Sequence, residues 1–190
     1  PNFEGSAKGI SRFNVVENKE SLYSKVRELI NSYRQEVLVE EFIEGKELTV
    51  GILENGTCSV LPILEIDFSS CQKSGEFFYS WRMKEFQGDD KQGLTPTFYC
   101  PARLDKETEK LVKDTALRTH RALGCYGISR TDIRLSQENI PYVLETNPLP
   151  GLNPKESNFP IMAYAAGMKY GDIIETILMS AYKRRKAENG

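Results

Sequence analysis

The sequence predicts an α+β fold, in which antiparallel strands joined by tight turns are flanked by amphipathic helices. The first observation is the Asn55-Gly56 pair between two apolar runs, which is typical of a β-hairpin. The second is a pair of alternating runs, 127–135 and 140–147, joined by the polar turn 136–139. The third is the helical spacing of apolar residues in three further stretches, which begin near Asn18, Asp105 and Ile173.

The chain opens with a loop, within residues 1–16, that contains glycines and Ser6. Glycines let successive backbone N–H groups turn toward an anion, as they do in phosphate-binding loops. Because the spacing is not that of a P-loop, an ordinary hairpin turn is the alternative interpretation. Asn18 then caps a predicted helix that ends near residues 32–35.

Strands are predicted over Val37–Ile43, Glu47–Leu53 and Cys58–Ile66. Two adjacent glutamates interrupt the first of them, and they indicate either a solvated edge or hydrogen bonds to a ligand at the mouth of the sheet. Residues 67–100 are predicted to be irregular. Their aromatic residues and two cations predict either a wall of a nucleotide site or a loop folded over the core. These residues are Phe77, Phe78, Tyr79, Trp81, Arg82 and Lys84.

A longer helix is predicted from its cap at Asp105 to Leu123. The residues expected to face inward are Leu111, Val112, Ala116 and Leu123. His120 lies on the side of Val112 and Ala116, which favours a packed histidine over a catalytic one. A short helix over 160–167 and an amphipathic helix over 173–182 complete the predicted elements.

The hairpin over residues 127–147 carries the side chains that we expect to perform chemistry. With a four-residue turn, the simplest register sets Leu135 against Ile140, and it sets Asp132 against Val143. Side chains alternate between the faces of a strand, and directly opposed residues share a face. The residues expected to crowd one face are Arg130, Asp132, Glu145 and Asn147. Two carboxylates and an amide suit Mg²⁺, whereas ordinary cross-strand ion pairs are the alternative.

The bulk composition excludes several classes of function. A net charge of −2, with 39% hydrophobic and 27% charged residues, is ordinary for a globular protein and gives no reason to expect nucleic acid or a membrane surface as a partner. No stretch is long and apolar enough to span a bilayer, and no signal peptide opens the chain. The four cysteines show no CxxC or other metal spacing, so we expect a reducing, cytoplasmic location.

Several stretches, in their order and spacing, together resemble the ATP-grasp ligases, and most closely the D-alanine–D-alanine ligases. The matching stretches are EGSAKG, VLVEEFIEGKELTV, FYSWRMK, CPARL, ALGCYGISRTDIRL, LETNPLPG and AGMKY. The resemblance implies the C-terminal part of the ATP-grasp fold, with 1–43 as the second part of the lid subdomain and 44–190 as the C-terminal subdomain. It implies an ATP-dependent ligase that joins two amino acids through an acyl phosphate, in the synthesis of peptidoglycan precursors.

The resemblance also implies a role for individual residues. Those implied to contact ATP are Glu40, Phe42, Ile43, Glu47, Phe78, Lys84 and Leu144. Asp132, Glu145 and Asn147 would hold two Mg²⁺ or Mn²⁺ ions. Ser6 would sit in a loop that closes over the phosphates, and Ser157 would bind the carboxylate of the second amino acid. Arg130 and the backbone N–H of Gly151 would hold the oxyanion of the tetrahedral intermediate.

The chain also departs from the family pattern. Upstream phosphate-binding lysines and the N-terminal domain for the first substrate are absent, so we expect this chain alone to be inactive, and a homodimer would form through that domain. Glu85 replaces a tyrosine and Ala7 a serine, which leaves the second substrate open. D-alanine is the expected substrate. The alternatives are a ligase for other amino acids and a non-catalytic ATP-binding module of the same fold.

Overall fold

The structure is a computed structural model that describes residues 1–188, and the chain divides into two compact units. The first unit comprises Pro1–Phe42 and Asp67–Thr97, and the second comprises Ile43–Ile66 and Phe98 onward. Residues 67–97 belong to the first unit, whereas the predicted boundary at residue 43 assigns them to the second. The assignment of the units to lid and C-terminal subdomains stays a prediction.

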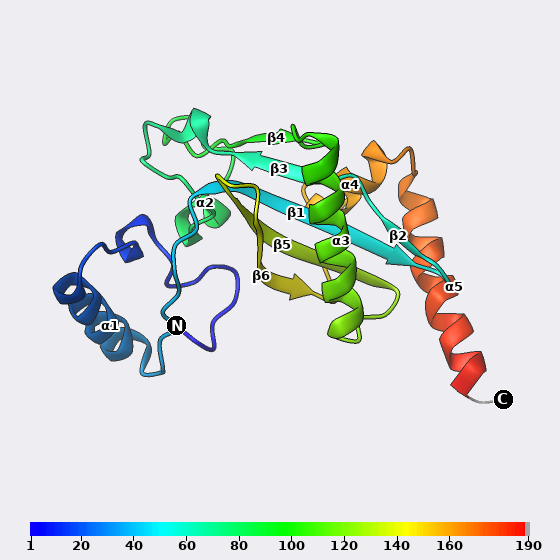
Figure 1. Cartoon of the computed structure of the whole chain (residues 1–190), viewed down its shortest axis with the longest axis horizontal. Coiled ribbons are helices and arrows are strands. Elements are labelled where there is room, and N and C mark those ends of the chain that lie inside the picture. The colour runs from blue at the N-terminus through cyan, green and yellow to red at the C-terminus, as the bar shows by residue number, and fades with distance from the viewer. Residues whose placement is uncertain (189–190) are drawn as a thin grey trace. The chain divides into compact units, whose positions relative to one another are not determined.

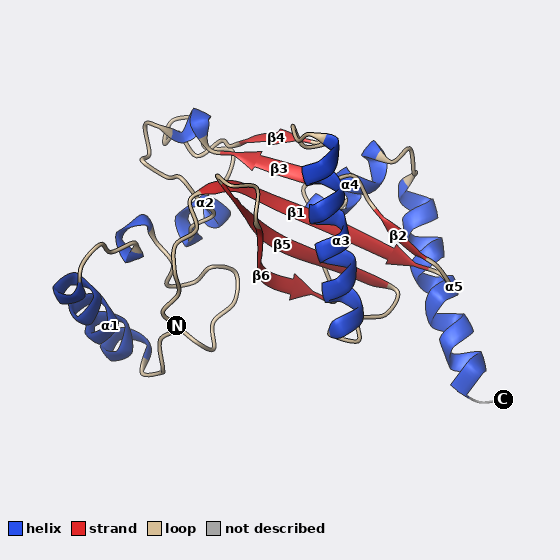
Figure 2. Ribbon diagram, in the orientation of Figure 1, coloured by secondary structure: helices blue, strands red, loops and turns tan. Residues whose placement is uncertain are grey.

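An antiparallel sheet, whose strands differ in length, forms the centre of the second unit (Figure 2). Its six strands run in the order β4-β3-β1-β5-β6, with β2 also paired to β1. The strands are β1 (Gly45–Glu54), β2 (Cys58–Val60), β3 (Leu64–Asp67), β4 (Thr97–Tyr99), β5 (Ile128–Ser136) and β6 (Pro141–Asn147). The long pairing of β1 with β5, from Gly45↔Ser136 to Leu53↔Ile128, fixes which residues share each face.

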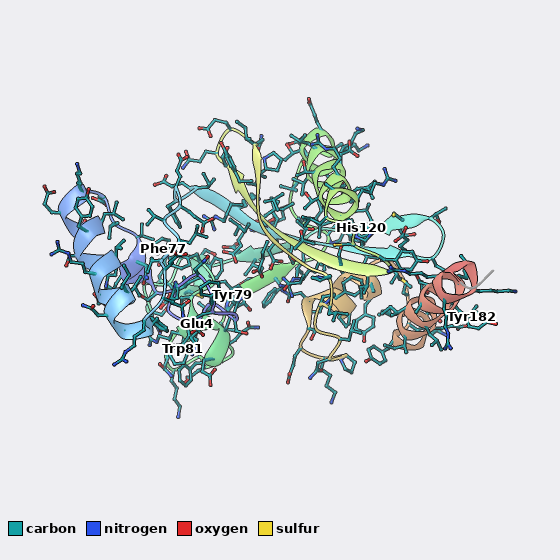
Figure 3. All side chains as sticks on the ribbon, turned by 90° about the horizontal axis from the view of Figure 1, so that it is seen from below. Glu4, Phe77, Tyr79, Trp81, His120 and Tyr182 are labelled. Atoms are coloured by element: carbon teal, nitrogen blue, oxygen red, sulfur yellow. The ribbon has the colours of Figure 1, made fainter. Side chains whose placement is uncertain are left out.

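Three helices cover the two faces of this sheet. Helix α3 (Lys106–Ala122) packs on one face, where its Val112 and Ala116 join a buried cluster with strand residues such as Leu48 and Ile133. Helices α4 (Asn158–Ala165) and α5 (Tyr170–Glu188) pack on the other face, where Phe159 and Ile173 join Leu53 and Leu64. Figure 3 shows α3 and α4 on opposite sides of the sheet.

Helix α3 begins as predicted, because the Asp105 carboxylate accepts hydrogen bonds from the backbone N–H groups of Glu107 and Thr108. His120 is 1% exposed, which confirms that it is packed. The prediction that Leu111 and Leu123 face inward is wrong, since they are 41% and 63% exposed. The helical period carries them away from the narrow stripe that meets the sheet.

The first unit contains η1 (Arg12–Asn14), α1 (Lys19–Tyr33), η2 (Ser69–Cys71) and α2 (Trp81–Glu85) (Figure 1). The Asn18 side chain accepts a hydrogen bond from Ser21 N and caps α1 as predicted. A small buried cluster of Cys71, Met83 and Leu94 holds 67–97 together. This segment is therefore less irregular than the sequence predicts.

Two strand predictions need correction. The stretch Val37–Ile43 belongs to no strand within the described residues, and Leu38 is 62% exposed. Apolar, β-branched composition is not enough for a strand, which also needs a neighbour to satisfy its backbone N–H and C=O groups. The predicted strand Cys58–Ile66 is two strands, β2 and β3, because Pro62 between them lacks the N–H that a continuous ladder requires.

Candidate functional site

One face of β1, β5 and β6 collects polar side chains. Residues Glu47, Thr49 and Gly51 of β1 stand opposite Arg134, Asp132 and Arg130 of β5, and alternation puts all six on the face away from α3. On the far side of β5, Asp132 pairs with Glu145 and Arg130 pairs with Asn147. The four residues that the hairpin predicts to share a face, Arg130, Asp132, Glu145 and Asn147, are therefore brought together.

The register that produces this arrangement differs from the predicted one. Leu135 pairs with Pro141 rather than with Ile140, a slip of one residue, which alone would send Glu145 to the opposite face. A bulge between Asp132 and Ile133 of β5 shifts the pairing again, so that Leu144 is the extra residue of β6. The bulge returns Glu145 to the face of Asp132, and it leaves Leu144 50% exposed.

Hydrogen bonds hold the carboxylates of this patch in place. Arg130 donates from Nε to Asp132 Oδ1 over 2.9 Å and from a terminal nitrogen to Oδ2 over 2.6 Å, a bidentate pair. Thr49 Oγ1 donates to Asp132 Oδ1 over 2.6 Å. Asn147 Nδ2 donates to Glu145 Oε1 over 2.9 Å, and Arg130 lies 3.7 Å from the same oxygen. The Glu145 side chain is 56% exposed, so its carboxylate remains open to a ligand.

A second charged pair continues the polar face toward the start of β1. Arg134, which is 6% exposed, donates from Nε to the Ile43 carbonyl over 3.0 Å and reaches Glu47 Oε2 over 3.3 Å. Arg134 and Thr49 belong to this polar face, although neither was predicted as a site residue. The alternation Glu47-Leu48-Thr49 and the spacing Asp132-x-Arg134 could have indicated both, because each places a polar residue on the face of a predicted ligand.

The loop after β6 approaches the start of α4. A Cβ added to Gly151 would lie 2.8 Å from the Ser157 hydroxyl, so a larger residue there would require the Ser157 side chain to move. Ser157 Oγ accepts a hydrogen bond from Asn153 N over 3.0 Å, and it makes no side-chain cap to α4. The predicted oxyanion donor Gly151 and the predicted substrate ligand Ser157 are therefore neighbours.

The predicted loop residue Ser6 lies in the first unit, in a backbone conformation that side chains rarely adopt. Ser6 and Ala7 have φ of 55° and 58°, in the left-handed region. Lys8 N donates to the Gly5 carbonyl over 3.0 Å within this loop. Lys8 also pairs with Glu4 at 3.0 Å and, chiefly through that hydrogen bond, lowers the Glu4 pKa. Non-glycine residues held at positive φ carry strain, which is often found at functional loops.

Two predicted ATP contacts of the first unit, Phe42 and Phe78, pack with Phe77 in an aromatic group, and a third, Lys84, lies beside a different ring. The rings of Phe42, Phe77 and Phe78 lie 5.0 to 5.9 Å apart between centroids, as edge-on or tilted pairs. Lys84 Nζ lies 5.6 Å from the centre of the Tyr79 ring, which holds the cation over an aromatic face. Phe77 and Tyr79 are both visible in Figure 3. Glu40, another predicted contact of this unit, is exposed.

Comparison with known families shows which family the chain belongs to. A family model described as "D-ala D-ala ligase C-terminus" matches residues 1–179. This chain belongs to that family.

Curated relatives give the same result. The chain is 37% identical over 187 residues to the D-alanine–D-alanine ligase of Methylacidiphilum infernorum, a match that covers 98% of this chain and 55% of the relative. It is 34% identical to the corresponding ligase of Pseudothermotoga lettingae, over 96% of this chain and 56% of the relative. The chain thus spans about half the length of these relatives.

Solved structures share the fold. The D-alanine–D-alanine ligase of Bacillus anthracis complexed with ATP superposes with a TM-score of 0.68 at 26% identity, over 91% of this chain and 50% of that one. The VanG D-Ala:D-Ser ligase of Enterococcus faecalis gives 0.67 at 25% identity, over 92% of this chain and 46% of that one. The predicted α+β, ATP-grasp fold is confirmed. None of the helices within residues 1–188 is long and apolar enough to cross a membrane.

Proposed function

We propose that this chain is the ATP-binding and metal-binding part of an ATP-dependent ligase that joins two amino acids, with D-alanine as the substrate. The observation that carries the proposal is the patch of Asp132, Glu145 and Asn147 beside Arg130. The similarity of the chain to D-alanine–D-alanine ligases also supports the proposal. Because the chain spans about half of those proteins, the complete activity is proposed for a protein that also carries their amino-terminal half.

The patch suits magnesium because its available ligand atoms are all oxygens. Asp132 and Glu145 supply carboxylates, and the Asn147 amide uses its nitrogen toward Glu145, which leaves its carbonyl oxygen for an ion. When bound, Mg²⁺ would neutralise charge on the phosphoryl group that is transferred. Thr49 and Arg130 would keep the Asp132 carboxylate oriented, since both already hydrogen-bond to it.

The remaining steps are assigned to residues of this chain. An acyl phosphate forms when a substrate carboxylate attacks the terminal phosphoryl group of ATP and displaces ADP. An amine then attacks the acyl carbon, and the amide forms as the amine loses a proton and inorganic phosphate leaves. Such transfers depend mainly on positioning and on charge neutralisation. Lys84 would contact a phosphate, and the Gly151 N–H and Arg130 would donate to the oxyanion of the second step. Glu47, fixed by Arg134, would accept the ribose hydroxyls.

The proposed function also distinguishes the chain from a module that only binds nucleotide. Such a module has no use for a bidentate arginine pair beside an exposed second carboxylate, which is the arrangement of Arg130, Asp132 and Glu145. We further propose a cytoplasmic location, which suits the four free cysteines.

The test replaces each carboxylate by its amide in a protein that carries this chain with the amino-terminal half of its relatives. Asp132→Asn and Glu145→Gln are each expected to lower the rate of D-alanine-dependent phosphate release at least about 100-fold, because each removes charge from the metal site. Lys110→Ala, on the exposed side of α3, is the control. Thermal melts check that each variant is folded, and carboxylate variants within a few-fold of the unmodified protein would contradict the proposal.

Glu85 allows a second test, of the class of the second substrate. It is exposed at the end of α2, where relatives carry a neutral tyrosine by the resemblance described above. An anion near the entering nucleophile would favour an ammonium group, so we expect amide rather than ester products. The assay compares D-alanine with D-lactate from pH 6 to 9, in the unmodified protein and in Glu85→Gln. A preference for D-lactate at neutral pH would refute this assignment.

A further inference from the structure

A second group of potential ligands lies on the other face of the sheet, under α3. Glu54 ends β1, Cys58 begins β2, and the two are directly opposed in the hairpin. His120 reaches them from the last turn of α3. One ligand atom from each of the three side chains lies within 4.8 Å of the other two. The β1–β2 hairpin and the end of α3, which are more than sixty residues apart in sequence, thus converge at one place.

His120 provides an independent indication that a ligand is missing. Its side chain is 1% exposed, and its Nε2 makes no hydrogen bond although it is buried. The other ring nitrogen, Nδ1, lies 2.7 Å from Ser129 Oγ. If Nδ1 carries the proton and donates a hydrogen bond to Ser129, Nε2 is left with a lone pair and lies 3.5 Å from Glu54 Oε2. Nε2 of His120 and Oε2 of Glu54 would then both be acceptors, and a cation bound between them would satisfy both.

The spacing of the three atoms suits a small tetrahedral ion. Zinc binds nitrogen and oxygen at about 2.0–2.2 Å and sulfur at about 2.3 Å, so two ligands of one tetrahedral ion lie roughly 3.3–3.8 Å apart. The 3.5 Å between His120 Nε2 and Glu54 Oε2 falls within that range. The three ligand atoms all lie within 4.8 Å of one another, so a small movement of the side chains would bring them to the distances of a zinc site.

We propose that Glu54, Cys58 and His120 bind one Zn²⁺, with water as the fourth ligand. Thiolate and imidazole favour zinc over magnesium or calcium, which prefer oxygen ligands. The Glu54 side chain is 21% exposed, which gives the ion a route from solvent. The site lies on the face opposite Asp132, so its role is structural: it ties the β1–β2 hairpin to the end of α3.

Neighbouring groups already orient two of the ligands. Ser129, on β5, would fix the ring of His120 through the hydrogen bond to Nδ1. The backbone N–H of Gly127 donates to Glu54 Oε2 over 3.2 Å. Hydrogen bonds of this kind hold metal ligands in position, and their loss weakens binding about 10–100-fold. Ser129 is therefore a positioning residue for the proposed ion.

The experiment titrates the metal-free chain with Zn²⁺ against a chromophoric chelator, and with Co²⁺ followed by absorption. We expect one Zn²⁺ per chain, a thiolate-to-cobalt charge-transfer band, and a rise in melting temperature with Zn²⁺. Cys58→Ala and His120→Gln should each weaken Zn²⁺ binding more than tenfold. Cys58→Ala should also remove the charge-transfer band and the rise in melting temperature.

Two control variants locate the ion. Cys125→Ser removes a different thiol, and Asp114→Asn removes a carboxylate on the solvent side of α3; both should bind Zn²⁺ as the unmodified chain does. Glu54→Gln serves as a ligand variant that leaves the buried ring intact, should His120→Gln fail to fold. The proposal is overturned if the unmodified chain binds no Zn²⁺, or if Cys58→Ala binds it as tightly as the unmodified chain.

Discussion

The two faces of the sheet in the second unit differ in how their side chains are satisfied. Leu48 and Thr49 are neighbours on β1 and are 0% and 1% exposed, yet Leu48 packs in an apolar cluster under α3, whereas Thr49 hydrogen-bonds to Asp132. A carboxylate near each residue shows the same contrast. Glu65, opposite Leu48, is buried and held by two cations, whereas Glu145, beside Asp132, is half exposed. At this point along β1, the α3 face is closed by packing, whereas the other face carries an exposed carboxylate that is able to bind a ligand.

The largest expected effect on stability is on the packed face. Leu48→Ala should lower the free energy of unfolding by about 2–5 kcal/mol, because it removes buried methyl groups and leaves a cavity. Thr49→Ala, one residue away, should lower it by only about 1 kcal/mol, mainly through the hydrogen bond to Asp132. Urea denaturation of both variants measures the difference. Equal losses would mean that the two faces contribute to stability in the same way.

The part of the binding face that α4 covers should behave like a packed core. A Cβ on Gly51 would lie 2.9 Å from Leu61 Cδ1 and 3.0 Å from Phe159 Cε2, so Gly51→Ala should lower the free energy of unfolding by about 1–3 kcal/mol. The matched control is Gly171→Ala in α5, where nothing lies within 4 Å of the added Cβ. That change should stabilise by about 0.5–1 kcal/mol. Thermal or urea unfolding of Gly51→Ala and Gly171→Ala measures the two changes in the free energy of unfolding.

The buried carboxylate on the packed face gives a test by pH. Burial alone would raise the pKa of Glu65, but hydrogen bonds from Arg103 and Lys46 outweigh it and lower that pKa below 4.5. A lowered pKa stabilises the folded state above the pKa of the unfolded chain, and this stabilisation is lost as pH falls through the folded value.

Glu65→Gln tests that assignment. At pH 7 it should lower the free energy of unfolding by about 1.5–3 kcal/mol, since it weakens charged hydrogen bonds. The difference from the unmodified chain should shrink as pH falls below about 4. Urea melts at a series of pH values supply the measurement. A difference that does not depend on pH would show that Glu65 is not ionised when folded.

The smallest effect is expected at the solvent side of α3. Lys110 and Asp114 pair at 2.6 Å, but their side chains are 78% and 50% exposed. Lys110→Ala should therefore change the free energy of unfolding by no more than about 0.5 kcal/mol. Urea denaturation measures this change, which serves as the baseline for the variants on the two faces of the sheet. A loss above about 1 kcal/mol would indicate that this surface of the helix packs against something else.

The sequence by itself determined most of the elements of this chain. Local signals suffice where the cause is local: Asn18 and Asp105 accept hydrogen bonds from the next turn, and the Asn55-Gly56 turn joins strands that are adjacent in sequence. The face shared by Arg130 and Asp132 follows from alternation within one strand. Family resemblance then supplied the expected ATP and metal residues, whose roles remain proposals.

Only the tertiary structure decided how the strands pair and which residues meet across them. The β5–β6 register depends on a bulge at Leu144, which no local pattern specifies, and without it Glu145 would face away from Asp132. Val37–Ile43 forms no strand, because a strand needs a neighbouring strand and the local sequence does not decide whether one is present. The meeting of Glu54 and Cys58 with His120 joins residues more than sixty positions apart. Linear cysteine spacing gives no sign of it, because the ligands are assembled by packing a helix on a sheet.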